Sequence, residues 1–108
     1  MSILLSEKSK NYIEKNKISE IFIDINFIEE PCTQVYEPKI TIINSKNKKE
    51  LATKDIVSDD GLTLSISDSF IKIYGLLDEY QLELGGLLKK MLRLNNVEPI
   101  IKNICKIN

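Results

Sequence analysis

The amino-acid sequence predicts an α+β fold that is mainly β, namely a small β-rich domain with an N-terminal helix packed on the sheet. Short segments in which apolar and polar residues alternate, as in half-buried strands, recur along the chain. Turn-forming Gly, Pro and Asp residues separate these segments, and a helix-start pattern precedes them. The length of 108 residues, with 43% hydrophobic and 29% charged residues, leads us to expect one domain over residues 1–108.

The first predicted element is a helix over residues 5–17. Ser6 is a favourable N-cap, and the carboxylate of Glu7 would interact well with the positive end of the helix dipole. The helix would bury a partial apolar stripe that consists of Leu5, Tyr12 and Ile13.

Two strands are predicted on either side of a cysteine-containing segment. The stronger covers residues 21–28, and Pro31 should end it because proline cannot donate to a sheet ladder. The second covers residues 39–44, which are rich in β-branched side chains, with Pro38 at its start. The apolar face of the first strand would consist of Ile21, Ile23, Ile25 and Phe27.

A β-hairpin is predicted in the middle of the chain. Residues 51–57 suit a weak strand, and the alternating pattern of residues 62–67 suits its partner. The turn between them would be Ser58-Asp59-Asp60-Gly61, in which glycine permits a positive φ and the aspartates can bond to their own backbone.

The remaining segments are more ambiguous. Residues 70–74 suit a strand by residue type, but Asp68 can cap a helix, and we favour a short helix or an irregular turn. Strands are expected over residues 80–84 and 87–94. Residues 95–108 are apolar enough to pack on the domain but show no clear helix or strand pattern.

Composition narrows the classes of function. With 15 Lys and Arg against 16 Asp and Glu, the net charge of −1 disfavours nucleic acid as a partner. No apolar run approaches the roughly 20 residues of a membrane span, and the N-terminus lacks a signal or transit pattern, so a cytoplasmic location is expected. The chain has no histidine, the usual general base and commonest zinc ligand, and we therefore expect it not to be an enzyme.

Charge is unevenly distributed along the chain. Residues 55–83 contain seven acidic residues and one basic residue, whereas residues 89–106 contain five basic residues and one acidic residue. Such sorting is typical of a surface that docks a partner or a second copy of the chain, although solvated faces explain it equally well.

Cys32 is the leading candidate for a functional residue. It lies in a polar segment over residues 29–38, predicted as a loop between two strands, where a metal or another sulfur atom can reach a thiol. The nearby Glu29, Glu30 and Glu37 disfavour a thiolate unless a cation or a metal is present. The simpler interpretation is a small buried hydrophobic residue.

Cys105 is the second candidate. A reduced cytoplasmic pair of cysteines favours a reactive or metal-binding role over a structural disulfide, and Cys105 is expected to act as a second ligand beside Cys32. Two thiolates do not complete a four-cysteine site, but two chains related by a two-fold axis would supply four.

Other motifs are weak. Gly85-Gly86 lacks the surrounding glycine spacing and the Lys-Ser/Thr pair of a phosphate loop. The clustered acidic residues suit turns and surfaces rather than acid–base chemistry, and they are Asp59, Asp60, Asp78 and Glu79.

The order of these features resembles that of a known family. An N-terminal helix is followed by a strand, a cysteine segment that ends in Tyr36-Glu37-Pro38, a further strand, an Asp60-Gly61 turn into another strand, and the late Cys105. This order resembles the HesB-like or IscA-like A-type iron-sulfur carriers, especially a divergent branch with a Cys-Cys or selenocysteine-Cys motif. Thr33 stands where that branch has its second thiol or selenol, and the C-terminal Cys-Gly-Cys of the carriers is reduced to Cys105.

The resemblance implies an iron-sulfur cluster, iron or sulfur carrier-type accessory protein, with Cys32 as acceptor thiolate and Cys105 as partner ligand. Contacts with iron-sulfur assembly or recipient proteins are expected with this function, and a homodimer is expected because one chain supplies only two thiolates. From charge and hydropathy we expect no nucleic-acid and no membrane partner. The alternative is a metal-free protein-interaction module that has kept the HesB-like fold. A third hypothesis is a thiol redox protein in which Cys32 and Cys105 form a reversible disulfide.

Overall fold

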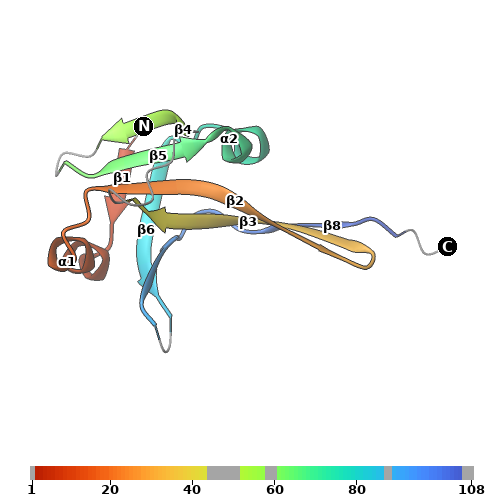
Figure 1. Ribbon diagram of the computed structural model, residues 1–108, viewed down its shortest axis with the longest axis horizontal. Helices are drawn as coiled ribbons and strands as arrows, with labels where there is room; N and C mark the ends of the chain where they lie inside the picture. The colour runs from red at the N-terminus through yellow and green to blue at the C-terminus, as the bar shows by residue number, and fades with distance from the viewer. Residues whose placement is uncertain (1, 44–51, 58–60, 87–88, 106–108) are drawn as a thin grey trace.

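The computed structural model describes residues 2–43, 52–57, 61–86 and 89–105, which form two β-sheets and two helices (Figure 1). The prediction of an α+β fold that is mainly β is confirmed. Among the described residues, no helix has the length and apolar character needed to cross a bilayer. In chain order the elements are β1 (Ser2–Leu5), α1 (Glu7–Lys15), β2 (Glu20–Glu30), β3 (Thr33–Ile42), β4 (Ala52–Val57), β5 (Thr63–Ser67), α2 (Asp68–Tyr74), β6 (Glu79–Gly85), β7 (Met91–Leu94) and β8 (Ile100–Asn103).

The larger sheet has the strand order β4-β5-β2-β3-β8. Its central strand β2 is parallel to β5 and antiparallel to β3. Only Pro31 and Cys32 separate β2 from β3, so these two strands form one long hairpin. The far end of this hairpin extends well beyond the other elements, with β8 beside it (Figure 1).

The smaller sheet consists of β1, β6 and β7, with β1 parallel and β7 antiparallel to the central strand β6. Helix α1 is attached to β6 through Ser9, whose buried hydroxyl donates a hydrogen bond of 3.2 Å to the carbonyl of Leu82. Ser6 caps α1 by accepting a hydrogen bond from the backbone N–H of Ser9. The predictions of an N-terminal helix on a sheet and of a Ser6 cap are confirmed.

The hydrophobic core joins both sheets and both helices. In the larger sheet, Ile21 lies opposite Leu64 and Ile23 lies opposite Ile66, and all four side chains are fully buried. The remaining members of the buried cluster are Ile13, Leu62, Phe70, Tyr80, Leu82, Leu92 and Leu94. Burial of these apolar side chains is the main force that holds the two sheets together.

Helix α2 confirms the preference for a helix after the predicted strand of residues 62–67. Its N-cap is Ser67 rather than Asp68, because the Ser67 hydroxyl accepts the N–H of Phe70 at 3.1 Å. Asp68 lies instead in the first helical turn. Gly75 ends the helix with a φ of +76°, a backbone conformation that favours glycine.

The predicted hairpin of residues 51–67 is confirmed for the described part, since β4 and β5 pair in antiparallel fashion. Residues 58–60 of its predicted turn lie outside the described residues. The predicted strand over residues 80–84 corresponds to β6. Of the strand predicted over residues 87–94, only residues 91–94 form β7, and residues 87–88 lie outside the described part.

The prediction of a loop over residues 29–38 is wrong. Strand β2 continues to Glu30 and β3 begins at Thr33, so that most of this segment is paired. Pro38 consequently lies inside β3 instead of at its start. Strands β1 and β8 were not predicted, and β8 occupies part of the C-terminal region to which no structure was assigned.

Candidate functional site

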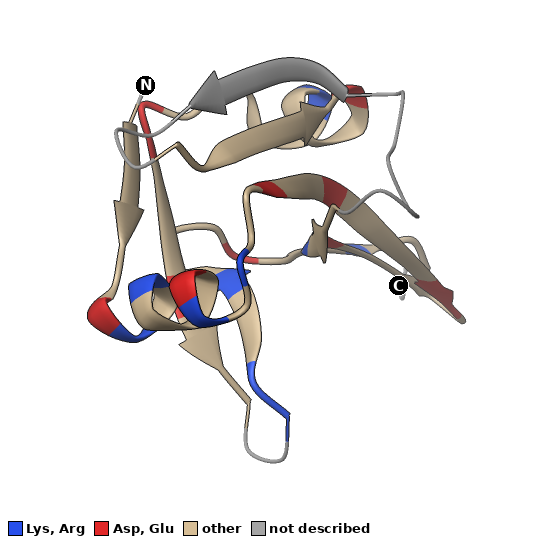
Figure 2. Cartoon of the chain, turned by 60° about the vertical axis from the view of Figure 1, so that its left-hand side comes forward, with Lys and Arg blue, Asp and Glu red and all other residues tan. Residues whose placement is uncertain are grey.

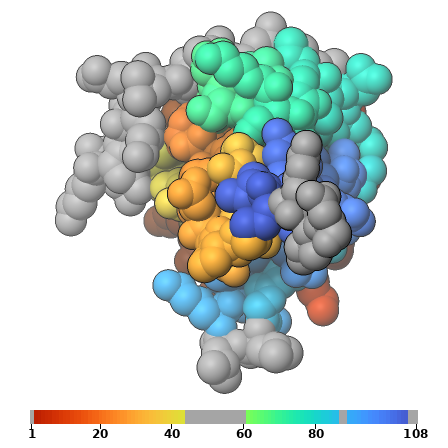
Figure 3. Space-filling model, turned by 90° about the vertical axis from the view of Figure 1, so that its right-hand side faces the viewer, coloured from red at the N-terminus to blue at the C-terminus, as the bar shows by residue number. Residues whose placement is uncertain are grey.

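Both predicted site residues lie on one projection, which we call the arm: residues 27–36 of the β2–β3 hairpin together with residues 100–105, which comprise β8 and the two residues after it. Tyr36 pairs with Ile100 at the base of β8, and Thr33 pairs with Asn103 near the tip. Figure 3 shows the arm end-on, where the orange-yellow end of the hairpin lies directly against the blue C-terminal strand. The arm therefore places two segments far apart in sequence next to each other.

Cys32 occupies the second position of the two-residue turn at the tip. Pro31 has a φ fixed near −65° by its ring, and Cys32 has a φ of +68°, the combination found in type II turns. Glycine or asparagine normally fills this second position because a side chain is strained there. A cysteine in this conformation is held in place by the surrounding structure, as residues at functional sites often are.

Cys105 reaches the same tip from the other side. The β3–β8 ladder continues past Asn103, because the N–H of Ile104 donates a hydrogen bond of 2.9 Å to the carbonyl of Cys32. Cys105 is the next residue, and it forms a disulfide with Cys32, with the two Cα atoms 4.5 Å apart. The two sulfur atoms are therefore directly bonded, as in the third of the sequence hypotheses.

Both cysteines are exposed to solvent. The interpretation of Cys32 as a buried hydrophobic residue is therefore wrong, and Cys105 is not buried either. No other cysteine exists in the chain, so the bond engages every thiol. The arm therefore carries the disulfide on two solvent-exposed residues at its tip.

Apolar side chains are exposed along the arm. Phe27, which is 47% exposed, packs against Tyr36 with ring centroids 4.9 Å apart, and the ammonium of Lys102 lies 5.2 Å from the Tyr36 ring. Ile101 and Ile104 are 68% and 50% exposed. Acidic residues lie at the far end of the arm, drawn in red in Figure 2.

The hydroxyl group of Tyr74 binds the backbone just before β8. Tyr74 on α2 donates a hydrogen bond of 2.6 Å to the carbonyl of Glu98 and lies 3.4 Å from the carbonyl of Tyr36. Burial raises the pKa of Tyr74, and the negative charge of nearby Glu37 raises this pKa further. Tyr74 therefore keeps its proton, and with it the donor of this bond, at neutral pH.

Replacing the strained residue should stabilise the turn. In a Cys105→Ser background, we expect Cys32→Gly to be more stable than Cys32→Ser by about 1 kcal/mol, because glycine adopts positive φ without strain. Urea denaturation followed by circular dichroism measures the difference. The matched control is Thr33→Gly in the same background. Thr33 is the next residue, lies in β3 and does not have a positive φ, so glycine at this position should destabilise the protein. Equal stability of the glycine and serine variants at position 32 would show that the turn is not strained.

The described residues offer no group of three or more His, Cys, Asp or Glu side chains arranged to hold a metal ion. Reduction of the disulfide would give two thiolates per chain, which is half of a tetrahedral four-cysteine site. The donor set of one chain alone therefore does not fit a closed iron or iron-sulfur site. Two chains would have to combine their arms to supply four sulfur ligands.

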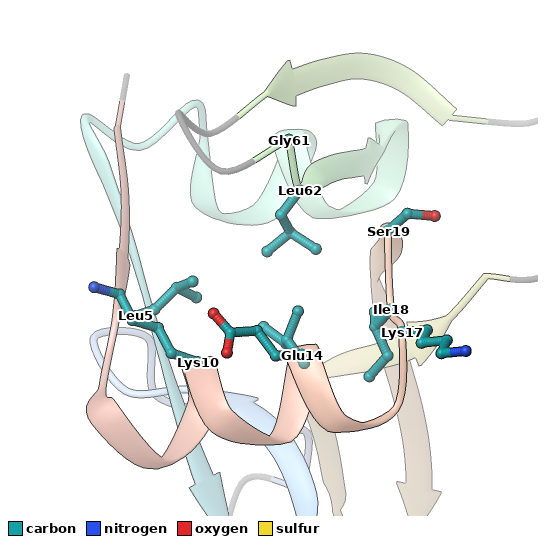
Figure 4. A pocket seen from close by; sticks show the side chains of 9 residues that line it. Leu5, Lys10, Glu14, Lys17, Ile18, Ser19, Gly61 and Leu62 are labelled. Carbon is teal, nitrogen blue, oxygen red and sulfur yellow. The ribbon is translucent and has the colours of Figure 1, made fainter.

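A hollow of about 340 Å³ lies at the opposite end of the molecule from the arm tip, beside α1 (Figures 1 and 4). Leu62 points into it from above and α1 forms its floor, while Lys17 and Ser19 point away from it (Figure 4). No motif in the sequence indicated this hollow, because its walls come from α1, β1 and the Gly61 turn. Its lining is mixed, because four of the nine residues are polar or charged, namely Lys10, Glu14, Lys17 and Ser19.

The fold and the site together define a small α+β domain with an exposed cysteine pair at the tip of a projecting β-hairpin. Comparisons with protein-family models, with curated proteins and with solved structures find no match for this chain. Membership in the HesB-like family therefore stays a prediction from the sequence resemblance.

Proposed function

We propose that this protein is a thiol–disulfide protein in which the Cys32–Cys105 pair accepts and returns two electrons. The observation that carries the proposal is an intramolecular disulfide, exposed at the tip of the arm, that joins the only two cysteines of the chain. An exposed disulfide is open to exchange with a thiolate, whereas a structural one is usually shielded. This was the third of the sequence hypotheses.

The exchange needs no group beyond the two sulfur atoms and a dithiol partner. A partner thiolate attacks one sulfur, a mixed disulfide forms, and the other cysteine leaves as a thiolate that takes up a proton. The second partner thiol then attacks the mixed disulfide and releases the first cysteine. The chain gains two electrons and two protons, and the partner dithiol becomes a disulfide.

Both cysteines belong to one chain, and this favours the return to the disulfide. After reduction, the Tyr74–Glu98 hydrogen bond keeps the start of the Cys105 segment close to the arm. Each encounter of the two thiols is therefore intramolecular and has a high effective concentration. Reoxidation within one chain is expected to outpace cross-linking between chains.

We propose the cytoplasm as the location, where thiol–disulfide bonds are transient and the pair would be mainly reduced between reactions. Rapid acid quenching of cells followed by thiol alkylation measures the oxidised fraction. A pair found fully oxidised in growing cells would contradict this location and favour a structural bond in an oxidising compartment.

The proposed function is tested by reducing the disulfide while the protein stays folded. Incubation of the folded protein with dithiothreitol should release two thiols per chain, measured by alkylation and intact-mass spectrometry, while circular dichroism shows that the core remains folded. Mild oxidation should remove both thiols again without forming disulfide-linked dimers. Cys105→Ser is the matched variant, because its single thiol should form mixed disulfides or cross-linked dimers. A bond that opens only after denaturation would identify a structural disulfide and leave the interaction-module alternative.

The iron or iron-sulfur carrier remains a second candidate function. It is favoured by one observation: both cysteines of the chain meet on an exposed projection that a second copy can approach, and reduction would free both thiols as ligands. Anaerobic addition of iron and sulfide to the reduced protein should then produce visible absorption and a dimer by size-exclusion chromatography. Cys32→Ser should abolish both, and Cys105→Ser should do the same. A colourless monomer under these conditions would contradict the carrier hypothesis but not the redox one.

A further inference from the structure

Strand β8 is an edge strand of the larger sheet in the described structure. It pairs with β3 on one side through the short stretch Thr33–Tyr36 and has no described neighbour on the other side. Its residues are mostly exposed, and Ile101 is the most exposed of the large apolar side chains. Little apolar surface therefore attaches β8 to the domain.

The two ends of this segment are fastened in different ways. Before β8, the Tyr74 hydroxyl holds the carbonyl of Glu98. After β8, the Cys32–Cys105 disulfide holds the chain covalently to the hairpin tip. Between these points, the described contacts of the segment are a four-residue ladder, the Ile104–Cys32 hydrogen bond and the Lys102 ammonium 5.2 Å from the Tyr36 ring.

Whether β8 stays paired with β3 depends on the disulfide. Each ordered residue loses conformational entropy, and a solvent-exposed hydrogen bond offsets only part of this loss because water competes for the same groups. Core strands compensate through buried apolar area, which β8 lacks. Segments with few buried contacts and exposed backbone bonds are those that open locally in native proteins.

We propose that β8 is a strap released by reduction of the Cys32–Cys105 disulfide. In the oxidised protein the strap covers the edge of β3 over Thr33–Tyr36. When a dithiol donates two electrons and two protons to the disulfide, the segment over residues 100–105 leaves this edge while the Tyr74 bond keeps its base in place. The proposal rests on the proposed function only in requiring that the folded protein can be reduced.

Hydrogen–deuterium exchange with mass spectrometry tests the strap. Residues 100–104, and the amides of residues 33–36 that bond to them, should exchange roughly 100-fold faster after reduction with dithiothreitol. The internal control is Ile21–Ile23 in the buried part of β2, whose exchange in the folded state should stay slow. Unchanged protection of residues 100–104 in the reduced protein would overturn the proposal.

The variant Cys32→Ser/Cys105→Ser separates this proposal from the proposed function. It lacks the bond whatever the redox conditions, so its residues 100–104 should exchange as fast as those of the reduced protein, with or without dithiothreitol. Fast exchange in this variant, combined with a wild-type disulfide that resists native reduction, would show that the bond holds β8 on β3, but it would reject the redox function and with it the release of the strap by reduction. Slow exchange in this variant would reject the strap even where native reduction succeeds.

Discussion

Loss of the Cys32–Cys105 bond is expected to lower the free energy of unfolding by about 2 to 4 kcal/mol. The two cysteines are separated by 73 positions, so the bond closes most of the chain into one loop and strongly restricts the unfolded ensemble. The upper end of this range applies if β8 stays on β3 after reduction. The lower end applies if β8 is released, because the freed segment regains conformational entropy in the folded state.

Urea denaturation of the oxidised wild type and of Cys32→Ser/Cys105→Ser measures this effect as a shift of the midpoint. Dithiothreitol should move the wild-type midpoint toward that of the double variant and should leave the double variant unchanged. A double variant as stable as the oxidised wild type would show that the loop is already constrained in the unfolded chain.

Phe70→Ala should destabilise the protein by about 3 to 5 kcal/mol. Phe70 is 0% exposed and contacts two aromatic rings, with centroids 4.9 Å from Tyr74 and 6.5 Å from Tyr80. Its side chain leads from α2 into the core shared by the two sheets. Truncation to alanine would remove buried apolar area and leave a cavity that the rigid strands around it cannot fill.

The matched control is Phe27→Ala on the arm. Phe27 also contacts a tyrosine ring at 4.9 Å, but it is half exposed, so its truncation should cost about 1 kcal/mol or less. Both variants are compared by thermal and urea denaturation. Similar losses at the two positions would contradict the assignment of the core to the junction of the two sheets and would place it along the arm.

The parts of the fold that the sequence predicted are those with a local pattern. The alternation of apolar residues revealed β2, β5 and β6, and Ser6 marked the start of α1. The missed strands, β1 and β8, have four residues each and depend on distant partners, β6 and β3, for their hydrogen bonds. Four residues are too few to show a periodicity, and their pairing is a property of the tertiary structure.

The tight turn after β2 was missed for a different reason. Pro31 and three nearby acidic residues suggested a long loop, since a two-residue hairpin turn usually contains glycine or asparagine. Cys32 adopts the positive φ that those residues normally supply. Pro38 is tolerated within β3 because it lies beyond the stretch that β8 covers, where one edge of the strand is open.

The sequence predicted which residues form the candidate site, but not how they are arranged. Cys32 and Cys105 were the expected residues, and a bond between them was one of the alternatives. Cysteine spacing alone does not determine pairing, since proximity here depends on the alignment of β8 against β3. Tyr74, which fastens the chain before β8, lies on another element and carried no sequence pattern that would have identified it.

The parallel pairing of β1 with β6 has a consequence for how the molecule assembles. Residues 2–5 of β1 pair with residues 79–82 of β6, and residues 100–103 of β8 pair with residues 33–36 of β3. During synthesis on the ribosome, neither sheet can be completed until most of the chain has emerged. Because these strands pair with segments far away in the sequence, we expect slow folding for a molecule of this size. The β2–β3 hairpin should form first, because its two strands are joined by a two-residue turn.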